Sequence, residues 1–448
     1  MAQALTRVNP NRLSVAFRHP ELCTRSATCV GICPEQAITL DANYYPVLDE
    51  SKCTECGLCY DACPGESVSF QRLSKIGFDH EESPRDFDGH IESVHVAHAT
   101  SDEIRYGGAG GGVVTALLLD MLKHGDVDGC VVTRMRKDKP WLGEPFIARS
   151  EEQLKQSQGS RYTVIPFNRV LQEIRREGGR YAVAALPCQV HGLRFAFEQD
   201  PDLRSRIPYV VGLFCGGALE PFVVPELLET KNISKEKISD FQFRGGDWPG
   251  KMRAVMKDGE IRDLHYSNYK DGAYNYFIGL YMPSRCQTCT DGSGLFSDLS
   301  VSDAWTRDKQ GNYKFAWHSR ILVRNDIGRQ ILERAVNRGT LKATNLGDDP
   351  AYLTHRQQTR RKGLNAPLRV ARWRDKGLPV PDYGLPDPEA SAREKLTERG
   401  VSFLLWLGKH RSIRYPLIWF LTSRYSIPLI KLRIYLKNRK YRRSGQSA

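Results

Sequence analysis

The sequence predicts an α/β protein in which a small, cysteine-dense α+β module precedes a larger, mixed α/β body. The module is indicated by residues 20–70, where cysteines crowd together and apolar runs are short. The body is indicated by residues 93–343, where short apolar runs alternate with helical patterns, as they do in layered α/β folds. A length of 448 residues, 40% hydrophobic and 26% charged, is typical of a globular protein of about three domains.

Five segments are expected along the chain. They are the module at 1–78, a polar linker at 79–92, the body at 93–345 with its two parts meeting near 170, a surface-wrapping segment at 346–400 and a basic amphipathic tail at 401–448. Apolar runs predict strands at 93–99, 129–135, 180–187 and 207–214. Helical patterns occupy 112–125, 169–178 and 220–230. This alternation predicts a largely parallel sheet.

Two motifs in the module share one cysteine spacing. The later motif matches the C-x2-C-x2-C-x3-C-P run of bacterial ferredoxins in full, whereas the earlier motif has Ser26 where its second cysteine should stand. Two ligand sets are expected, because the fourth cysteine of each run serves the other cluster. The complete set, for a [4Fe–4S] cluster, is Cys33, Cys53, Cys56 and Cys59. The incomplete set is Cys23, Cys29 and Cys63, with Ser26 facing the fourth position.

The incomplete set leaves three chemical outcomes open. They are a [3Fe–4S] cluster, a [4Fe–4S] cluster with Ser26 as a serinate ligand, and a [4Fe–4S] cluster with water or an outside ligand on the fourth iron. An oxygen donor is expected to shift the reduction potential. A pair of zinc sites is the alternative for the whole module, although zinc favours two Cys-x-x-Cys pairs or added histidines.

Four of the remaining cysteines are predicted to form a third four-thiolate site: Cys188, Cys215, Cys286 and Cys289. They stand in turns rich in Gly, Pro and Asp, which argues against inert core thiols. Because Cys188 begins a predicted helix, we expect the helix N-terminus to lower the pKa of its thiol. Cys130 lies within a predicted strand and is expected to be a small core residue.

With these motifs in this order, the body resembles the beta subunit of coenzyme F420 hydrogenases and dehydrogenases. That family includes ferredoxin-dependent chlorophyll-pathway reductases. The resemblance covers roughly residues 93–345 and rests on the blocks GGAGGGVVTALLLDMLKHGDVD, LPCQVHGLR, GLFCGG, FRGGDWPG, CQTC and FSDLSVSDAW. It implies FAD beside a [4Fe–4S] cluster held by the four body cysteines. It implies no single substrate, because members reduce a deazaflavin or a tetrapyrrole group.

Two loops are candidate contacts for the flavin. The glycine run before the helix at 112–125 lets backbone N–H groups approach a phosphate, and its candidate residues are Gly110, Gly111, Gly112 and Thr115. The second loop offers an arginine for pyrophosphate among small neighbours, with a plain loop as the alternative. Its candidate residues are Ser157, Gly159, Ser160, Arg161 and Tyr162. His191, three residues after Cys188, is the candidate proton donor, with a core histidine as the alternative.

The net charge of +13 belongs mostly to the tail. Residues 401–448 hold 11 Lys or Arg and no Asp or Glu, so the first 400 residues carry +2. Interleaved aromatic and basic residues are typical of a segment on an anionic membrane surface. Docking of an acidic electron carrier and packing of a helical hairpin on the body are the alternatives. No motif for reading nucleic acid accompanies the charge, so nucleic acid is not an expected partner.

Apolar runs and cysteine usage bear on location. No run of 18 apolar residues occurs, the N-terminus lacks a secretory core, and closely spaced cysteines suit a reducing compartment. We therefore expect a cytoplasmic protein, with the inner face of the membrane as its place if the tail binds lipid.

Together these features predict an FAD-dependent iron–sulfur oxidoreductase. Electrons would enter singly from a ferredoxin-like donor and leave as a hydride to an organic acceptor such as a deazaflavin or a tetrapyrrole-like compound. The alternative is an electron-transfer subunit of a hydrogenase- or dehydrogenase-type complex, with no substrate of its own. Either function is compatible with an oligomer. A redox or iron sensor is a third hypothesis, suggested by Ser26 alone.

Overall fold

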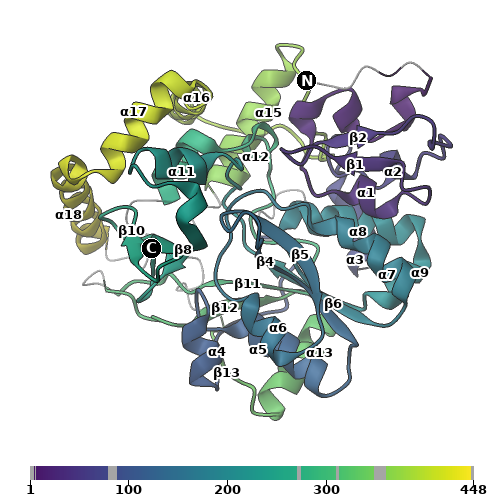
Figure 1. The fold of residues 1–448 in the computed structure, drawn as a ribbon, viewed down its shortest axis with the longest axis horizontal. Helices are drawn as coiled ribbons and strands as arrows, with labels where there is room; N and C mark the ends of the chain where they lie inside the picture. Colours follow the sequence, from purple (N-terminus) through teal and green to yellow (C-terminus); the bar gives the residue numbers. More distant parts are fainter. Residues whose placement is uncertain are drawn as a thin grey trace.

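The computed structural model describes residues 5, 7–78, 88–269, 274–308, 312–347 and 360–444. The N-terminal module packs on one side of the body, at the upper right of Figure 1, and the tail helices lie on the other side, at the upper left. Most of the predicted linker and residues 348–359 of the predicted surface segment lie outside the described residues.

An eight-stranded mixed sheet forms the centre of the body. Its strands in spatial order are β13 (Leu341–Asn345), β3 (Ser93–Ala99), β12 (Ser319–Val323), β11 (Leu299–Asp303), β7 (Tyr209–Leu213), β6 (Tyr181–Ala185), β4 (Gly129–Met135) and β5 (Gly143–Ala148). Strands β11, β7, β6 and β4 are parallel, and antiparallel pairs flank them. The predicted largely parallel sheet is correct only for this centre. A short hairpin loop joins β4 to β5, and such a loop can connect only antiparallel strands.

Helices cover both faces of this sheet (Figure 1). On one face, α5 (Val113–Lys123) and α13 (Asp326–Asn337) bury aliphatic side chains against the strands. On the other face lie α7 (Leu171–Glu177), α8 (Pro187–Gln199) and α9 (Pro201–Arg206). Shorter helices connect the layers: α4 (Asp102–Gly107), α6 (Glu151–Gln156), α10 (Val223–Glu229), α11 (Tyr274–Tyr281) and α12 (Ser284–Gln287).

The predicted elements of the body are recovered with small shifts at their ends. Strands β3 and β4 fill their predicted ranges, and β6 and β7 fall inside theirs. Helices α5, α7 and α10 lie within the three predicted helical stretches. Cys130 is fully buried in the core between α5 and the sheet, as predicted, with its Sγ 3.5 Å from the carbonyl oxygen of Leu118.

The N-terminal module packs directly on the α8 face of the body. It contains a hairpin and three helices: β1 (Ile38–Leu40), β2 (Pro46–Leu48), α1 (Thr28–Ile32), α2 (Leu58–Asp61) and α3 (Phe70–Phe78). Leu13, Ile32 and Leu73 of the module share one hydrophobic core with Leu193 and Phe296 of the body. The module and the body are therefore consecutive segments of the chain that share one hydrophobic core.

The first part of the segment after residue 360 is buried, whereas residues 374–397 are mostly exposed, as expected of a surface segment. The π-helix η8 (Arg360–Asn365) and α15 (Ala366–Arg374) bury Lys362 and Arg369, and the Arg369 guanidinium pairs with Glu398 at 3.0 Å. Further on, the chain crosses to the module, where the Val68 N–H donates to the carbonyl oxygen of Asp382 at 2.6 Å. Residues after 360 are thus packed against the body and are hydrogen-bonded to the N-terminal module.

A small antiparallel sheet lies beside the main one. Its strands are β8 (Ile238–Gly245), β9 (Lys251–Met256) and β10 (Ile261–Asp263). His265, just after β10, is 4% exposed, and its Nε2 accepts a hydrogen bond from the Met252 N–H at 3.2 Å. Burial lowers the pKa of His265 to about 4.

Mild acid should therefore destabilise the protein through His265. The unfolded chain protonates this imidazole near its ordinary pKa of 6.5, whereas the folded chain keeps it neutral down to about pH 4. Its contribution is complete above pH 6.5 and is lost as the pH falls. Between pH 7.5 and 5 we expect the free energy of unfolding to drop by about 2 kcal/mol. Urea unfolding measures this drop, and His265→Gln, which keeps an acceptor for Met252, should reduce it. An equal drop in that variant would assign the acid sensitivity to other groups.

The tail forms three helices along one side of the body. They are α16 (Ala392–Leu407), α17 (Arg411–Thr422) and α18 (Ile427–Ser444). Among the described residues, none of the helices combines the length and the apolar character needed to cross a membrane.

Candidate functional site

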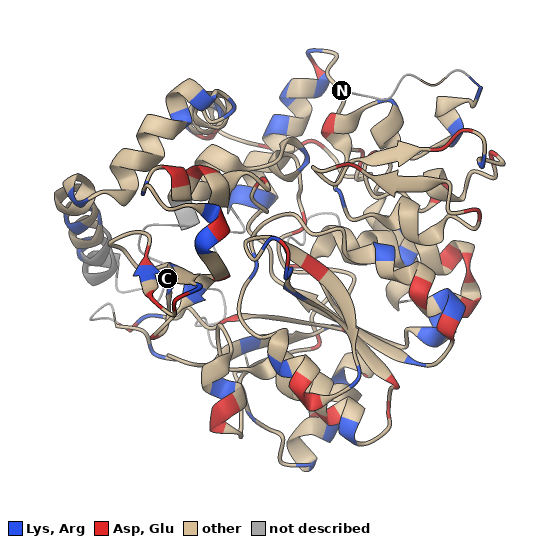
Figure 2. Ribbon diagram, in the orientation of Figure 1, with Lys and Arg blue, Asp and Glu red and all other residues tan. Residues whose placement is uncertain are grey.

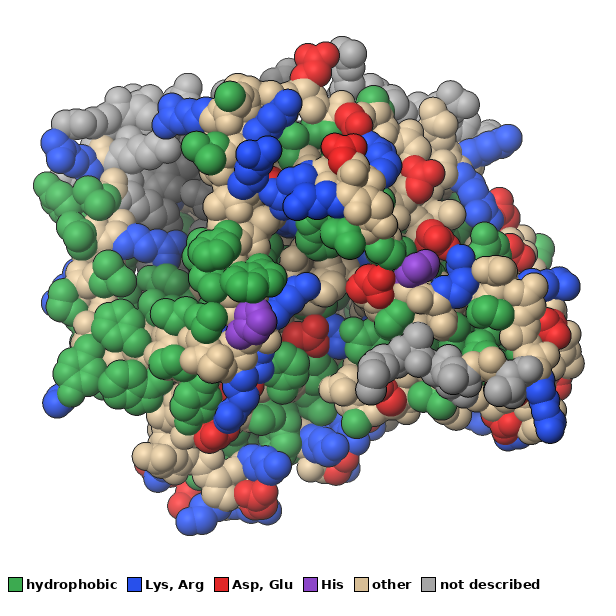
Figure 3. Space-filling view, turned by 90° about the horizontal axis from the view of Figure 1, so that it is seen from above, with side chains coloured by type: hydrophobic (Ala, Val, Ile, Leu, Met, Phe, Trp, Pro, Cys, Tyr) green, Lys and Arg blue, Asp and Glu red, His purple; other side chains and the backbone are tan. Residues whose placement is uncertain are grey.

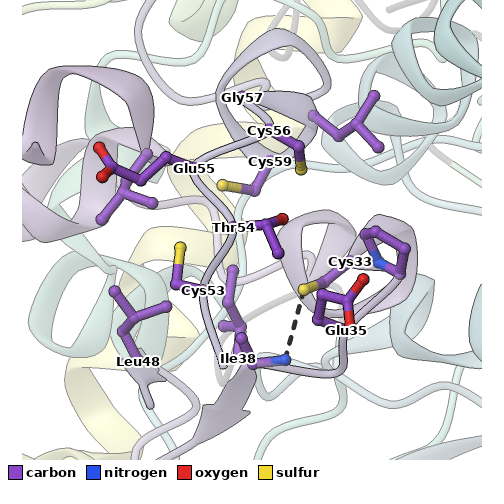
Figure 4. A pocket seen from close by; sticks show the side chains of 14 residues that line it. Cys33, Glu35, Ile38, Leu48, Cys53, Thr54, Glu55, Cys56, Gly57 and Cys59 are labelled. Atoms are coloured by element: carbon purple, nitrogen blue, oxygen red, sulfur yellow. Dashed lines mark hydrogen bonds between the residues drawn. The ribbon is translucent and has the colours of Figure 1, made fainter. Parts of the chain in front are cut away.

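Four cysteines of the module line one pocket: Cys33, Cys53, Cys56 and Cys59. The pocket encloses about 360 Å³, including its open mouth, and Figure 4 shows the four sulfur atoms around the same space. Cys33 lies at the end of α1 and accepts a hydrogen bond from the Ala37 N–H at 3.4 Å, whereas Cys56 is exposed. The structure brings together the four thiols of the predicted complete set.

The incomplete set also gathers in one place. Burial, together with the neighbouring Cys63, raises the pKa of the Cys23 thiol to about 12. Burial also raises the pKa of Cys29 well above its ordinary value, with smaller contributions from Cys23 and Cys63. Such thiols stay protonated unless a metal replaces the proton, so this group is suited to metal ligation.

Ser26 keeps the position of a cluster ligand. The residues flanking it have positive φ angles of 54° and 61°, and those flanking Cys56 in the complete motif have 52° and 84°. The loop therefore keeps its shape even though Ala27 stands where the complete motif has glycine. Ser26 is 4% exposed, and its Oγ is 3.1 Å from the hydroxyl of Thr24 and 3.0 Å from that of Thr28.

The four body cysteines come together from separate elements. Cys188 is in the first turn of α8, Cys215 follows β7, and Cys286 and Cys289 lie in and just after α12. The prediction of a lowered pKa at Cys188 is wrong. Burial is the largest effect and raises the pKa well above its ordinary value, and Cys286, Cys215 and Cys289 raise it further. The helix N-terminus does not offset the loss of hydration.

A buried lysine, which sequence reasoning missed, lies beside these thiols. Lys362 of η8 is 3% exposed. Burial alone would lower the pKa of its amine, but Cys289, Cys215 and Cys286 raise it above its ordinary value. A cation at this place favours negative charge on the sulfur ligands.

Arg285 connects the body thiols to the module. Its Nε donates to the carbonyl oxygen of Gly65 at 3.0 Å and its Nη2 to that of Pro64 at 3.2 Å, while Nη1 donates to the Tyr383 hydroxyl at 2.8 Å. Because Cys63 precedes Pro64 and Cys286 follows Arg285, ligands of two predicted sites lie on either side of one guanidinium.

A second arginine also joins the module to the body. The buried Arg25, next to Ser26, makes a bidentate ion pair with Glu220 at 2.8 and 3.0 Å. The Arg25–Glu220 ion pair therefore holds the loop of the incomplete motif against the body.

None of these groups is compact enough for one ion. In the part of the chain that the structure describes, no three Cys, His, Asp or Glu side chains converge on a single metal position. A zinc ion needs each sulfur about 2.3 Å from one centre. Both zinc and iron–sulfur clusters accept such soft thiols, and the cysteine spacing of the complete motif is the one that favours a cluster.

The two candidate flavin loops lie side by side. Gln158 Nε2 donates to the carbonyl oxygen of Ile104 at 2.8 Å, and a Cβ on Gly107 would lie 2.6 Å from Gln158 Oε1. Gly112 has a φ of 70° and caps α5, in which Thr115 is buried, while the Gly111 N–H donates to Ser319 Oγ at 3.1 Å. The glycine turn is thus folded tightly against β12.

Arg161 is engaged differently from the prediction. Its Nη atoms donate to carbonyl oxygens of its own loop, namely those of Gln156, Ser157 and Gly159, at 2.7 to 3.1 Å. Burial lowers its pKa to about 10, and its buried Nε has no hydrogen-bond partner. The guanidinium holds the loop in shape, which leaves Nε as the donor available to a ligand.

An aromatic wall adjoins the glycine turn. Tyr162 stacks on Tyr269 with ring centroids 5.2 Å apart, and Trp248 stacks on Trp305 at 5.0 Å. Behind them, Arg244 and Asp303 form a bidentate pair at 2.9 and 3.2 Å.

This wall and the glycine turn meet at one carboxylate. Asp303 Oδ1 is only 3.0 Å from the place of a Cβ on Gly110. The buried Nε1 of Trp248 has no hydrogen-bond partner. Stacking rings, an unpaired donor and a turn without side chains fit a planar ligand that carries phosphate.

His191 is not placed as a proton donor. It is 2% exposed, its Nε2 is 2.9 Å from Asp291 Oδ2, and its ring packs against Phe70 and Phe296. Asp291 in turn accepts backbone N–H bonds from the loop after Cys289. The core-histidine alternative describes this position better, since the imidazole ties α8 to the cysteine loop.

Three groups of thiols and a glycine-lined aromatic site define the class: an iron–sulfur electron-transfer protein of the oxidoreductase type. Comparison with known families agrees. Residues 22–67 match a 4Fe-4S dicluster domain, 94–172 the N-terminal domain and 178–349 the C-terminal domain of the coenzyme F420 hydrogenase/dehydrogenase beta subunit. The chain belongs to this family of beta subunits.

Curated relatives are distant but extensive. One subunit of the F420H2 dehydrogenase from Methanosarcina mazei is 24% identical over 72% of this chain and 85% of its own length. The beta subunit of the coenzyme F420 hydrogenase from Methanothermobacter thermautotrophicus is 26% identical over 65% of this chain and 99% of its own length. The coenzyme F420-dependent sulfite reductase of Methanocaldococcus jannaschii is 25% identical over 69% of this chain, which spans 45% of that relative.

A solved structure supports the fold. One chain in the F420-reducing [NiFe] hydrogenase complex from Methanosarcina barkeri superposes with a TM-score of 0.53 at 21% identity. The match covers 68% of this chain and 99% of the other. The mixed α/β fold of the body is therefore shared with that complex.

Proposed function

We propose that this chain is an iron–sulfur flavoprotein oxidoreductase. It takes single electrons from a ferredoxin-type donor and exchanges a hydride with an organic acceptor such as a deazaflavin or a tetrapyrrole-like compound. The observation that carries the proposal is the contact of Arg285 with both the module and the body site, because it joins the cysteine groups into one series.

In this proposal each cysteine group has one task. Exposed Cys56 marks the entry group, which the donor can approach. The buried group of Cys23, Cys29 and Cys63 is intermediate, and the body cysteines form the last group. When bound, [4Fe–4S] clusters carry one electron at a time, and FAD joins two electrons and one proton into a hydride. Each hydride therefore requires two donor molecules and one proton.

The flavin would be held between the glycine turn and the aromatic wall. Backbone N–H groups of the turn that holds Gly110, Gly111 and Gly112 would meet a phosphate at the N-terminus of α5, near Thr115. The protein itself fills the space on the Cβ side of each of these glycines. The loop of Ser157, Gly159, Ser160, Arg161 and Tyr162 would close the other side, with Arg161 Nε as a donor. Trp248 and Trp305 would exclude water from the ring.

The alternative function is that of an electron-transfer subunit without a substrate of its own. Several relatives are named as subunits of hydrogenases and dehydrogenases, which favours this alternative. The two functions differ in one assay. The isolated chain should reduce a hydride acceptor with an artificial one-electron donor only if it is the complete enzyme.

Iron and flavin per chain, measured on anaerobically purified protein, test the proposal. About 11 or 12 irons with one FAD would support it, since each cubane holds four irons. About 7 or 8 irons with no flavin would overturn it.

Ser26→Cys should complete the intermediate group. The loop around Ser26 already has the shape of the loop around Cys56, so a thiol there should act as the fourth ligand. If the native group holds a three-iron cluster, iron should rise by about one per chain and the oxidised three-iron EPR signal should disappear. Thr39→Cys, on an exposed position of β1 in the same module, is the matched control and should change neither quantity. A persistent three-iron signal in Ser26→Cys would contradict the expected geometry.

A further inference from the structure

The tail helices turn their polar side towards the body. Arg414 of α17 is 8% exposed and pairs with Glu226 of α10 at 2.6 and 2.8 Å. Thr422 and Ser426 are buried on the same side, and Lys231 donates to the carbonyl oxygen of Thr422 at 2.7 Å. Polar contacts therefore hold much of the tail in place, together with the buried side chain of Ile418.

The opposite side of the tail is apolar and exposed. Trp406 is 52% exposed, Trp419 46% and Leu432 53%. Further large hydrophobic residues on α16, α17 and α18 are also exposed: Phe403, Leu404, Leu417, Phe420, Tyr425, Leu429, Tyr435 and Leu436. Figure 3 shows hydrophobic side chains gathered on the tail side of the molecule, with basic side chains among them. An apolar surface this large on a folded protein marks a contact site.

The charge of this surface is positive along α17 and α18, whereas α16 also carries Glu394 and Glu398. Helices α17 and α18 carry Lys and Arg but no Asp or Glu (Figure 2). Lys409, Arg424 and Lys431 are exposed beside the aromatic residues. A partner that covers this surface must therefore offer an apolar region to the aromatic and aliphatic side chains and negative charge to the Lys and Arg residues.

We propose that the outward face of α16–α18 lies on the surface of an anionic lipid bilayer. Trp and Tyr favour the level of the headgroups, Leu and Phe reach the acyl boundary, and Lys and Arg bind anionic headgroups. A second copy fits less well, because two identical basic faces would meet and repel. An acidic protein would satisfy the charges but would not need two exposed tryptophans. The proposal is independent of the reaction that the chain performs.

Flotation of the full chain with vesicles tests the proposal. We expect binding to vesicles of phosphatidylglycerol and phosphatidylethanolamine, and little binding to phosphatidylcholine vesicles. The triple variant Lys409→Gln, Arg424→Gln and Lys431→Gln should bind about 100-fold more weakly, since each basic residue near the surface contributes about fivefold. Trp406→Ser with Trp419→Ser should also lose binding, whereas Ile261→Ser with Tyr266→Ser, exposed outside the tail, should not.

The outcomes separate the occupants. Equal far-UV circular dichroism and iron content would show that the variants are folded. Wild-type protein that fails to float with anionic vesicles would overturn the proposal. So would a dimer in light scattering that Trp406→Ser with Trp419→Ser converts to a monomer, because the face would then be covered by a second copy.

Discussion

Cys286→Ser should remove at least one iron per chain and reduce electron transfer from donor to acceptor. The four body thiols belong to separate elements and surround one site beside Arg285 and Lys362. Loss of one thiolate from a four-thiolate cluster leaves an iron without its ligand. The module should keep its own iron, because its cysteines lie in other loops.

Cys130→Ser is the matched control for this substitution. Cys130 is a buried thiol like the others, but it packs between α5 and the sheet and takes part in none of the cysteine groups. The iron content and the turnover of the Cys130→Ser protein should equal those of the wild type. Iron analysis and donor-dependent turnover on the same preparations would test whether Cys286 is a cluster ligand. A full iron content in Cys286→Ser would show that it is not.

Arg285→Gln should uncouple the module from the body. The guanidinium makes three hydrogen bonds that join the Cys63 loop, Tyr383 and α12, and a buried charged hydrogen bond contributes roughly 1.5–3 kcal/mol. The shorter, neutral amide cannot replace all three. We expect the free energy of unfolding to fall by about 3 kcal/mol and electron delivery from the module to slow.

Rapid mixing with a reduced one-electron donor separates these two effects. In Arg285→Gln the module should still be reduced at the wild-type rate, while reduction of the acceptor should lag behind it. Arg338→Gln removes an arginine that pairs with Asp120 and Asp126 on the α5 face of the sheet, opposite the module, and should leave both rates unchanged. If both the module and the acceptor were reduced at the wild-type rates in Arg285→Gln, the contacts of Arg285 would contribute to stability and not to electron transfer.

The cysteine groups were predictable because their signals are local. The spacing around Cys56 determines a tight turn, and Gly, Pro and Asp around Cys188 and Cys286 place those thiols in turns as well. The strands were also predictable, since apolar runs such as 129–135 become the buried centre of the sheet. The antiparallel edges were not, because strand direction depends on how loops return the chain.

Residues that act across long sequence separations carried no local signal. Lys362 stands in a polar, arginine-rich stretch, which is typical of a solvated surface. Its burial follows from the path of the chain after residue 360, which no periodicity records. His191 and Arg161 had suitable chemistry in suitable places, but the groups that they contact depend on the fold. Asp291 holds the imidazole of His191, and backbone carbonyl oxygens hold the two Nη atoms of Arg161.

The backbone pairing between the module and residues 382–383 has a consequence for biosynthesis. Val68 and Phe70 donate hydrogen bonds to the carbonyl oxygens of Asp382 and Tyr383, and Arg285 is anchored on Tyr383 as well. The module therefore waits for residues some 300 positions later, roughly 15–60 s at ordinary rates of translation. The module can complete this backbone pairing only after residues 382–383 have been synthesised.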